Sequence, residues 1–268
     1  MLNLDEIRAD LVDEHAALDR LVSEIDDAQW DVPTPAEGWT VRDQISHLAF
    51  FDEQAALAVS DPEAFAGTLE EIAADVGTYM DRSISKGRAM PAPKVLTWWR
   101  TARADMLSEF EGLDSDRRIA WYGPPMKPAS FMSARIMETW AHGQDVADAL
   151  DVTREATPNL KHVAHLGVLA RKWSYAANNR PAPDGEVRVE LSGPERASWT
   201  WGPEEAKDRV SGDAYDFCLV VTQRRHPDDT DLRIIGDLAS DWLSIAQTYA
   251  GPPGAGRRAG QFPKRSSV

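Results

Sequence analysis

Apolar side chains recur at every third or fourth position through most of the first 150 residues, and this spacing constrains the fold more than any other feature. Such a stripe runs along one face of an α-helix and has to be buried against other elements. In the first helix, Glu14 and His15 interrupt the stripe at mid-length, where they either line a cavity between helices or turn to water. The apolar positions of this helix, within residues 3–26, are Leu4, Ile7, Leu11, Leu18, Leu21 and Ile25.

Further helices follow in the first part of the chain. Thr40 followed by Asp43 resembles a capping box, which predicts a helix beginning at the next residue, with His47 at the edge of its apolar stripe. Helix continues through "EEIAADVGTYMDRSI", a strong helix follows in "MPAPKVLTWWRTARADMLSEFEGL", and the last covers about 131–150. Four main helices with short connections predict an antiparallel four-helix bundle over residues 1–152.

The pattern changes in the second half of the chain. A helix over about 159–178 is expected in a linking segment, 153–180, and "GEVRVELSG" and "ASWTWG" then alternate as strands do. Shorter strands are expected in "DRVSG" and "LRIIGD", and helices in "DAYDFCLVVTQ" and "DLASDWLSIAQTYA". The sequence therefore predicts an α+β chain, with the bundle followed by a small mixed α/β domain at 181–251. The tail, 252–268, has the composition of a disordered end.

Composition limits the partners. The formal net charge of −15 argues against a nucleic-acid partner, which requires clustered Lys and Arg, and gives no reason to expect a membrane surface. No apolar run approaches the ~18 residues of a membrane span, and the acidic N-terminus does not resemble a signal peptide. The single cysteine, Cys218, excludes an intramolecular disulfide and fits a reducing cytoplasm. We expect a cytoplasmic protein, monomer or homodimer, that acts on a small molecule.

The stretch "ETWAHGQDVADAL" contains a candidate metal half-site. Glu138, His142 and Asp145 are four and three residues apart, so their side chains lie on one face of the predicted fourth helix. A catalytic zinc takes three protein ligands and keeps one open position, and His47 on another helix is the best candidate for the third ligand. Helix surfaces also carry such pairs as ordinary hydrogen bonds. Gly143 indicates a close approach, by a ligand or by another helix.

Two motifs together resemble a known family. "GWTVRDQISHLAFFDEQAA" and "ETWAHGQDVADAL" are similar to the mycothiol-dependent maleylpyruvate isomerase family of actinobacteria, a branch of the DinB-like superfamily of metal-binding four-helix bundles. The resemblance covers residues 1–150. It implies that His47, Glu138 and His142 bind a divalent metal, typically zinc, and that mycothiol is the co-substrate. The same ligand types also accept nickel, iron or manganese.

The resemblance and the spacing suggest roles for further residues. "VVTQRR" stands where family members often have a Gly-Arg pair ending a helix, which implies that Arg224 contacts the substrate, with Gln223 in place of the glycine. Asp145 binds a ligand, shuttles a proton or caps a neighbouring surface. Asp43 either orients the ring of His47 or caps its helix, because one rotamer cannot do both.

Three functions remain open from the sequence. The first is a metal-dependent and mycothiol-dependent enzyme, in which the thiolate attacks a small electrophile and gives either S-transfer or isomerisation. The metal favours the thiolate form of a thiol that is otherwise mostly protonated at neutral pH. The second is a metal-dependent hydrolase, and the third is a non-catalytic protein that binds a metal or a small ligand.

Overall fold

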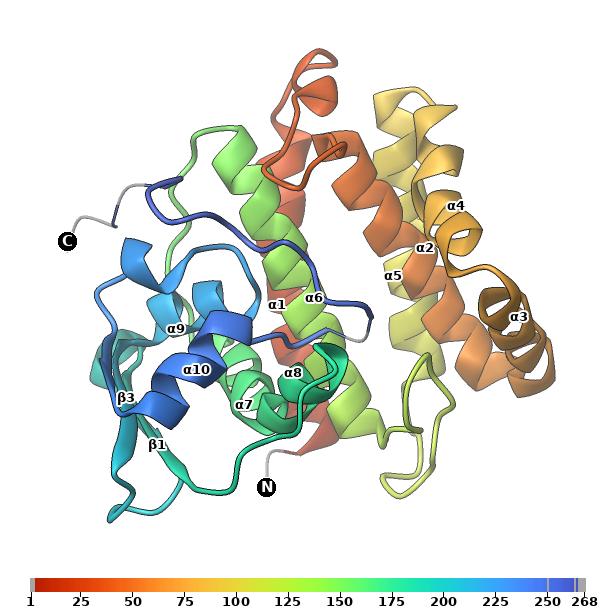
Figure 1. Ribbon diagram of the computed structural model, residues 1–268. Coiled ribbons are helices and arrows are strands. Elements are labelled where there is room, and N and C mark those ends of the chain that lie inside the picture. The colour runs from red at the N-terminus through yellow and green to blue at the C-terminus, as the bar shows by residue number, and fades with distance from the viewer. Residues whose placement is uncertain (1–2, 250, 263, 265–268) are drawn as a thin grey trace. The chain divides into compact units, whose positions relative to one another are not determined.

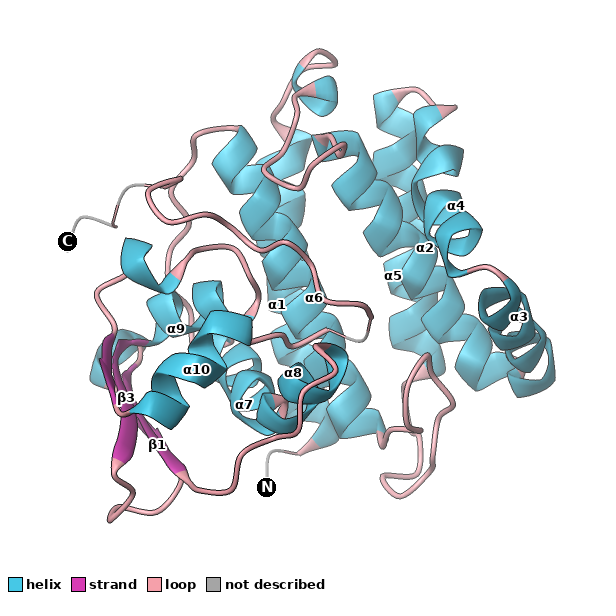
Figure 2. Cartoon of the chain, in the orientation of Figure 1, coloured by secondary structure: helices cyan, strands magenta, loops and turns pink. Residues whose placement is uncertain are grey.

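The computed structural model describes residues 3–249, 251–262 and 264, and the chain divides into two compact units, Met1–Arg154 and Glu155–Val268. Helices make up the first unit, and a small mixed sheet with helices makes up the second (Figure 2), which confirms the predicted α+β fold. Within the described residues, no helix is both long enough and apolar enough to cross a membrane.

The first unit is built on four long helices, with two shorter ones inserted between the second and third of them. Helix α2 packs against both α5 and α6, and α1 packs against α6 (Figure 1). The inserted helix α4 packs against α2. The helices are α1 Leu4–Ser23, α2 Val41–Ser60, α3 Pro62–Ala74, α4 Val76–Arg88, α5 Ala92–Glu109 and α6 Pro128–Ala149.

The N-terminus of α2 has the predicted capping box. The Thr40 backbone N–H donates to Asp43 Oδ2 at 2.9 Å, and the Thr40 side chain accepts from the Asp43 backbone N–H at 3.4 Å. The guanidinium of Arg88 on α4 donates to both carboxylate oxygens of Asp43, at 2.8 and 2.9 Å. Asp43 therefore acts as a cap and as the anchor of α4.

A layer of polar side chains interrupts the apolar core of the bundle, whose buried apolar side chains form two separate clusters. On α1, Ile7 and Leu11 belong to one cluster, and Leu18 and Val22 belong to the other. Helices α1, α2 and α6 contribute four buried polar side chains at the level between them. These four form the polar layer, with exposed fractions of 0–3%: His15, Asp52, Arg135 and Thr139.

The buried position of His15 predicts a loss of stability in mild acid. Burial, then the charges of Arg103 and Arg135, lower the pKa of His15 well below its usual value, and Asp19 opposes them only in part. The unfolded chain binds a proton near pH ~6.5 and the folded chain does not, so the free energy of unfolding falls as the pH falls below that value, by up to ~1.4 kcal/mol per pH unit.

Urea unfolding at several pH values between about 7 and about 5 measures this slope in the wild type and in His15→Phe. The other titrating groups are common to both proteins, so the difference between the two slopes isolates His15. The phenylalanine variant is expected to lose less stability per pH unit than the wild type. Equal slopes would contradict a neutral buried imidazole.

The second unit contains a four-stranded sheet in the order β2-β1-β3-β4. Strand β1 pairs in antiparallel fashion with β2 and in parallel with β3, and β3 pairs in antiparallel fashion with β4. Helix α9 packs on β1 and β3, and α10 packs on β3. The elements are β1 Val187–Ser192, β2 Ser198–Trp201, β3 Asp208–Asp213, α9 Ala214–Val221, β4 Arg233–Ile235 and α10 Asp237–Ile245.

One predicted helix of the second unit is divided in the structure, and part of the predicted tail lies within the described residues. The helix expected over 159–178 is divided into α7, Leu160–Leu169, and α8, Arg171–Ala177, because Ala170 has a non-helical ψ of 1°. The described part of the tail has no helix or strand, yet the backbone N–H of Gly260 donates to Asp229 at 2.7 Å. Residues 263 and 265–268 of the predicted tail lie outside the described residues.

Candidate metal centre

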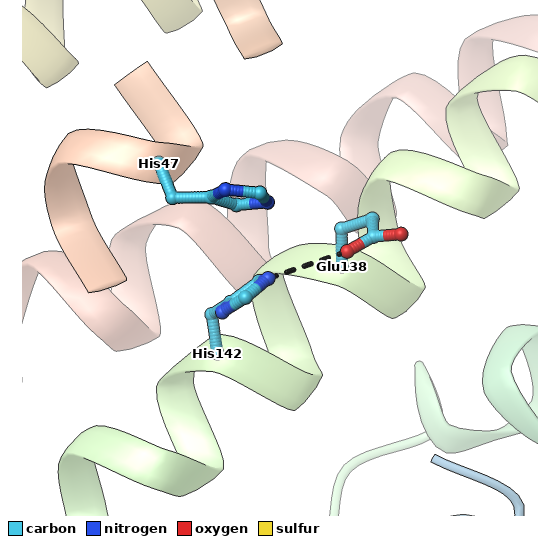
Figure 3. Close-up of side chains that lie close together, drawn as sticks. All are labelled: His47, Glu138 and His142. Carbon is cyan, nitrogen blue, oxygen red and sulfur yellow. Dashed lines mark ion pairs between the residues drawn. The ribbon is translucent and has the colours of Figure 1, made fainter. Parts of the chain in front are cut away.

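The structure brings His47 of α2 together with Glu138 and His142 of α6 (Figure 3). Each side chain offers one ligand atom, and these atoms all lie within 4.8 Å of one another. Glu138 and His142 meet because they are four residues apart on one helix, with 3.4 Å between Oε2 and Nε2. His47 joins them because α2 packs against α6. Both histidines are buried, whereas the Glu138 side chain is 25% exposed, so the group is open on the carboxylate side.

A chain of hydrogen bonds fixes the orientation of the His142 ring. The Thr34 hydroxyl donates to the Trp39 carbonyl at 2.9 Å, so its oxygen accepts the Gln44 amide N–H, also at 2.9 Å. The amide oxygen of Gln44 then faces His142 Nδ1 at 2.5 Å. Because an amide oxygen only accepts, Nδ1 is the donor in this contact, and Nε2 on the other side of the ring faces Glu138. Sequence reasoning missed Gln44, although it lies three residues before His47 on the same helix.

The ring of His47 has its own partner on α4. The hydroxyl of Ser83, which is fully buried, lies 3.1 Å from His47 Nδ1. A glycine makes this approach possible, because a Cβ on Gly87 would lie 1.7 Å from Ser46 Oγ of α2. Helix α4 therefore comes close to α2 only with glycine at this position. Neither Ser83 nor Gly87 was identified from the sequence.

Aromatic rings enclose the two imidazoles. The Trp39 indole lies 6.0 Å from the His142 ring in a stacked arrangement and 5.1 Å from the His47 ring. Phe51, one turn after His47 on α2, lies 4.5 Å from that imidazole. These rings restrict the rotation of the imidazoles and keep bulk water away from them. The loop that contains Trp39 was part of the sequence motif, so its position beside the site agrees with the resemblance.

The donor set fits a divalent cation. Two neutral imidazoles and one carboxylate are ligands that zinc accepts in sites with an open position. Metal-binding histidines generally make a hydrogen bond through the ring nitrogen that does not bind the metal. Here an amide oxygen and a hydroxyl lie beside Nδ1 of the two rings. A divalent ion held by one carboxylate would keep a net positive charge and would attract an anionic sulfur. The assignment of His47, Glu138 and His142 as metal ligands stays a prediction that this geometry supports.

Gly143 and Glu14 are explained by a neighbour rather than by a ligand. A Cβ on Gly143 would lie 3.1 Å from Nη1 of Arg154, so the glycine admits this side chain to α6. Arg154 donates to the Trp140 carbonyl at 2.8 Å and to Glu14 Oε1 at 2.6 Å. Glu14 is thus buried in an ion pair and is not turned to water.

Asp145, Arg224 and Cys218 lie outside the three-residue group. Asp145 is fully buried on α6, one turn after His142, and its role in the site stays a prediction. Cys218 is buried as expected, and burial raises the pKa of its thiol well above the usual value, which makes it a poor nucleophile.

Arg224 lies directly after α9 in the second unit. The helix ends in a Schellman motif, with the Gln223 N–H bonded to the Val220 carbonyl at 2.9 Å and the Arg224 N–H to the Leu219 carbonyl at 2.7 Å. Gln223 adopts the left-handed conformation, with a φ of 62°. Glycine is the residue that this position favours, which accounts for the glycine that family members often have there. The predicted contact of Arg224 with substrate stays a prediction.

Gln44 provides a test of the hydrogen bonds that orient the histidine rings. Gln44→Leu removes the acceptor at His142 Nδ1, so the ring loses its preferred tautomer, and zinc affinity is expected to fall by roughly 10- to 100-fold. Competition with a chelator of known affinity measures the change. Gln144→Leu is the matched control, because Gln144 is buried on α6 but its amide N–H donates to Asp148 at 2.8 Å. Equal zinc affinity in the two variants would contradict the role of Gln44.

Comparison with known proteins gives matches to sequence families, relatives and solved structures. The profile described as "Mycothiol maleylpyruvate isomerase N-terminal domain" matches residues 11–147, and one described as "Wyosine base formation" matches 183–233. Two uncharacterised Mycobacterium tuberculosis proteins, from strains CDC 1551 / Oshkosh and H37Rv, are each 45% identical over 249 residues, covering 93% of this chain and 97% of the relative.

The solved structures that match are crystal structures of the mycothiol-dependent maleylpyruvate isomerase and of a histidine-to-alanine mutant of it. Both have a TM-score of 0.58 and cover 84% of this chain and 90% of theirs, with sequence identities of 18% and 15%. At this level of identity the likeness shows a shared fold.

Proposed function

Because the chain belongs to the mycothiol maleylpyruvate isomerase family, we propose that it is a metal-dependent enzyme that uses mycothiol to act on a small electrophilic molecule. The observation that carries this proposal is the convergence of His47, Glu138 and His142 on one point. Both histidine rings have a hydrogen-bond partner at Nδ1 that fixes their orientation. The family provides the thiol, and the three residues provide the place where a metal would bind it.

Each part of the site has a role in this chemistry. When bound, a divalent ion, for which the ligands favour zinc, supplies positive charge that stabilises a thiolate at neutral pH. Gln44 and Ser83 hold the imidazoles with one ring nitrogen turned inward, and Trp39 beside them limits the access of water. The partly exposed Glu138 marks the side from which the thiol enters.

The thiolate adds to an electrophilic carbon of the substrate, and the next step decides the class of reaction. If the carbanion left by this addition is then protonated from solvent, or a leaving group departs from the attacked carbon, the sulfur stays on the carbon and the result is conjugation or S-transfer. If it is expelled after rotation about the former double bond, the result is isomerisation and the thiol is regenerated. We favour S-transfer or conjugation for this chain. Asp145 and Arg224 are the residues that we propose to assist catalysis and to bind the substrate.

The test is to measure turnover with and without mycothiol. Purified zinc-loaded protein is incubated with a panel of small electrophiles, including maleylpyruvate, and both product and free thiol are quantified. Turnover that requires the thiol supports the proposal: one thiol consumed per product indicates S-transfer, and no net consumption indicates isomerisation. Turnover without thiol would instead identify a hydrolase. Tight metal binding without turnover of any electrophile would favour the non-catalytic binding protein.

A further inference from the structure

The polar layer of the bundle contains buried polar atoms that have no hydrogen-bond partner among the described residues. Asp52 is fully buried. Its Oδ1 accepts two N–H groups of Arg135, at 3.1 and 2.8 Å, while its Oδ2 has no such partner. A hydrogen-bond partner is also missing for both ring nitrogens of His15, for Oγ1 of Thr139 and, beside the layer on α5, for Nε1 of Trp99. Buried polar atoms are bonded in most folded proteins, so their concentration at one level of the core requires an explanation.

Several of these groups face one another across the bundle. The His15 ring meets the Trp99 indole edge-on, with 6.0 Å between the ring centroids. The Trp99 indole N–H approaches the Asp52 carboxyl group closely enough to lower its pKa as a weak hydrogen-bond donor, although burial is the larger influence and raises that pKa overall. This N–H nevertheless does not reach hydrogen-bond geometry with Oδ2. Trp99 of α5 thus neighbours both His15 of α1 and Asp52 of α2, and each of these three side chains has a buried polar atom without a partner among the described residues.

The chemistry of these atoms selects among small ligands. A cation would lie close to the guanidinium groups of Arg103 and Arg135, whose charges both act on His15. An anion would lie against the free oxygen of Asp52. Water donates to a carboxylate oxygen and to an unprotonated imidazole nitrogen, and it accepts from an indole N–H. Internal waters in proteins typically have about three such partners.

We propose that the polar layer is a binding site for internal water, in which at least one ordered molecule bridges Asp52 Oδ2, Trp99 Nε1 and the ring of His15. The water completes the hydrogen bonding of the Asp52–Arg135 ion pair, which joins α2 to α6. It thereby links α1 and α5 to the two helices that carry the candidate metal ligands. Water binding at this layer does not depend on metal binding.

The first measurement is made on the wild-type protein. A crystal structure at about 1.5 Å is expected to show a water molecule within about 3.2 Å of Asp52 Oδ2 and of at least one of the other two groups. In solution, the indole N–H of Trp99 is expected to show a nuclear Overhauser effect with a long-lived water. A direct hydrogen bond from Trp99 to Asp52 with no density between the side chains would overturn the proposal, as would density that fits only an ion.

A variant provides an independent readout. His15→Phe keeps a ring against Trp99 but removes two polar atoms, so oxygen-17 relaxation dispersion is expected to count fewer long-lived waters than in the wild type. His226→Phe is the matched control, because this histidine lies in the second unit and its Nδ1 already accepts the Asp228 N–H at 3.2 Å. An unchanged count in His15→Phe would overturn the role of His15, and if this variant fails to fold, the wild-type crystal structure decides.

Discussion

His142→Ala is expected to lower the bound metal from about one ion per chain to almost none, and to abolish thiol-dependent turnover. The substitution removes a residue that is close to both other members of the group, since His142 Nε2 faces Glu138 and its ring lies 4.6 Å from that of His47. Two ligands from different helices would remain, and they hold a divalent ion poorly. Elemental mass spectrometry of the purified, reconstituted protein measures the metal content.

The control for this experiment is His165→Ala, in the second unit, where the histidine accepts the Trp201 indole N–H at 3.1 Å and is not part of the three-residue group. This variant is expected to keep the full metal content. Circular dichroism confirms that both variants are folded. If His142→Ala retained a full equivalent of metal, the proposed ligands would be wrong.

Arg135→Met is expected to destabilise the protein by about 3–5 kcal/mol, because it leaves Asp52 buried without its partner. Both side chains of this ion pair are buried. Burial already raises the pKa of Asp52, and Arg135 is the strongest opposing influence. Without the arginine, the carboxyl group must either take up a proton or remain charged in the core. Urea unfolding at neutral pH measures the loss.

The double variant Asp52→Leu/Arg135→Met separates the charge from the packing. Replacing both partners removes the unpaired charge, so most of the lost stability is expected to return. Arg82→Met is the control, because its pair with Glu71 is about half exposed on both sides and contributes at most about 1 kcal/mol. A double variant as unstable as Arg135→Met would show that shape, rather than charge, dominates at this layer.

Local spacing was sufficient for most of the helices and for the Glu138–His142 half of the candidate metal site. The stripe of α1, the cap at Thr40 and the four-residue step from Glu138 to His142 are properties of a single helix, and they appear where the sequence predicts them. The break at Ala170 was not predicted, because nothing in the apolar spacing of that segment marks it. The pairing of His47 with α6 came from the motif, since local spacing does not place one helix against another.

The tertiary structure alone decided what surrounds those ligands. Gln44 meets His142 across 98 residues of chain, and Ser83 meets His47 across 36, through contacts set by the packing of helices. The partners of Asp52 and Glu14 are likewise far away in sequence. Periodicity in a sequence reports which face of a helix is buried, because that depends on neighbours within one or two turns. Which buried polar group meets which depends on the crossing and register of helices, and these exist only once the bundle has formed.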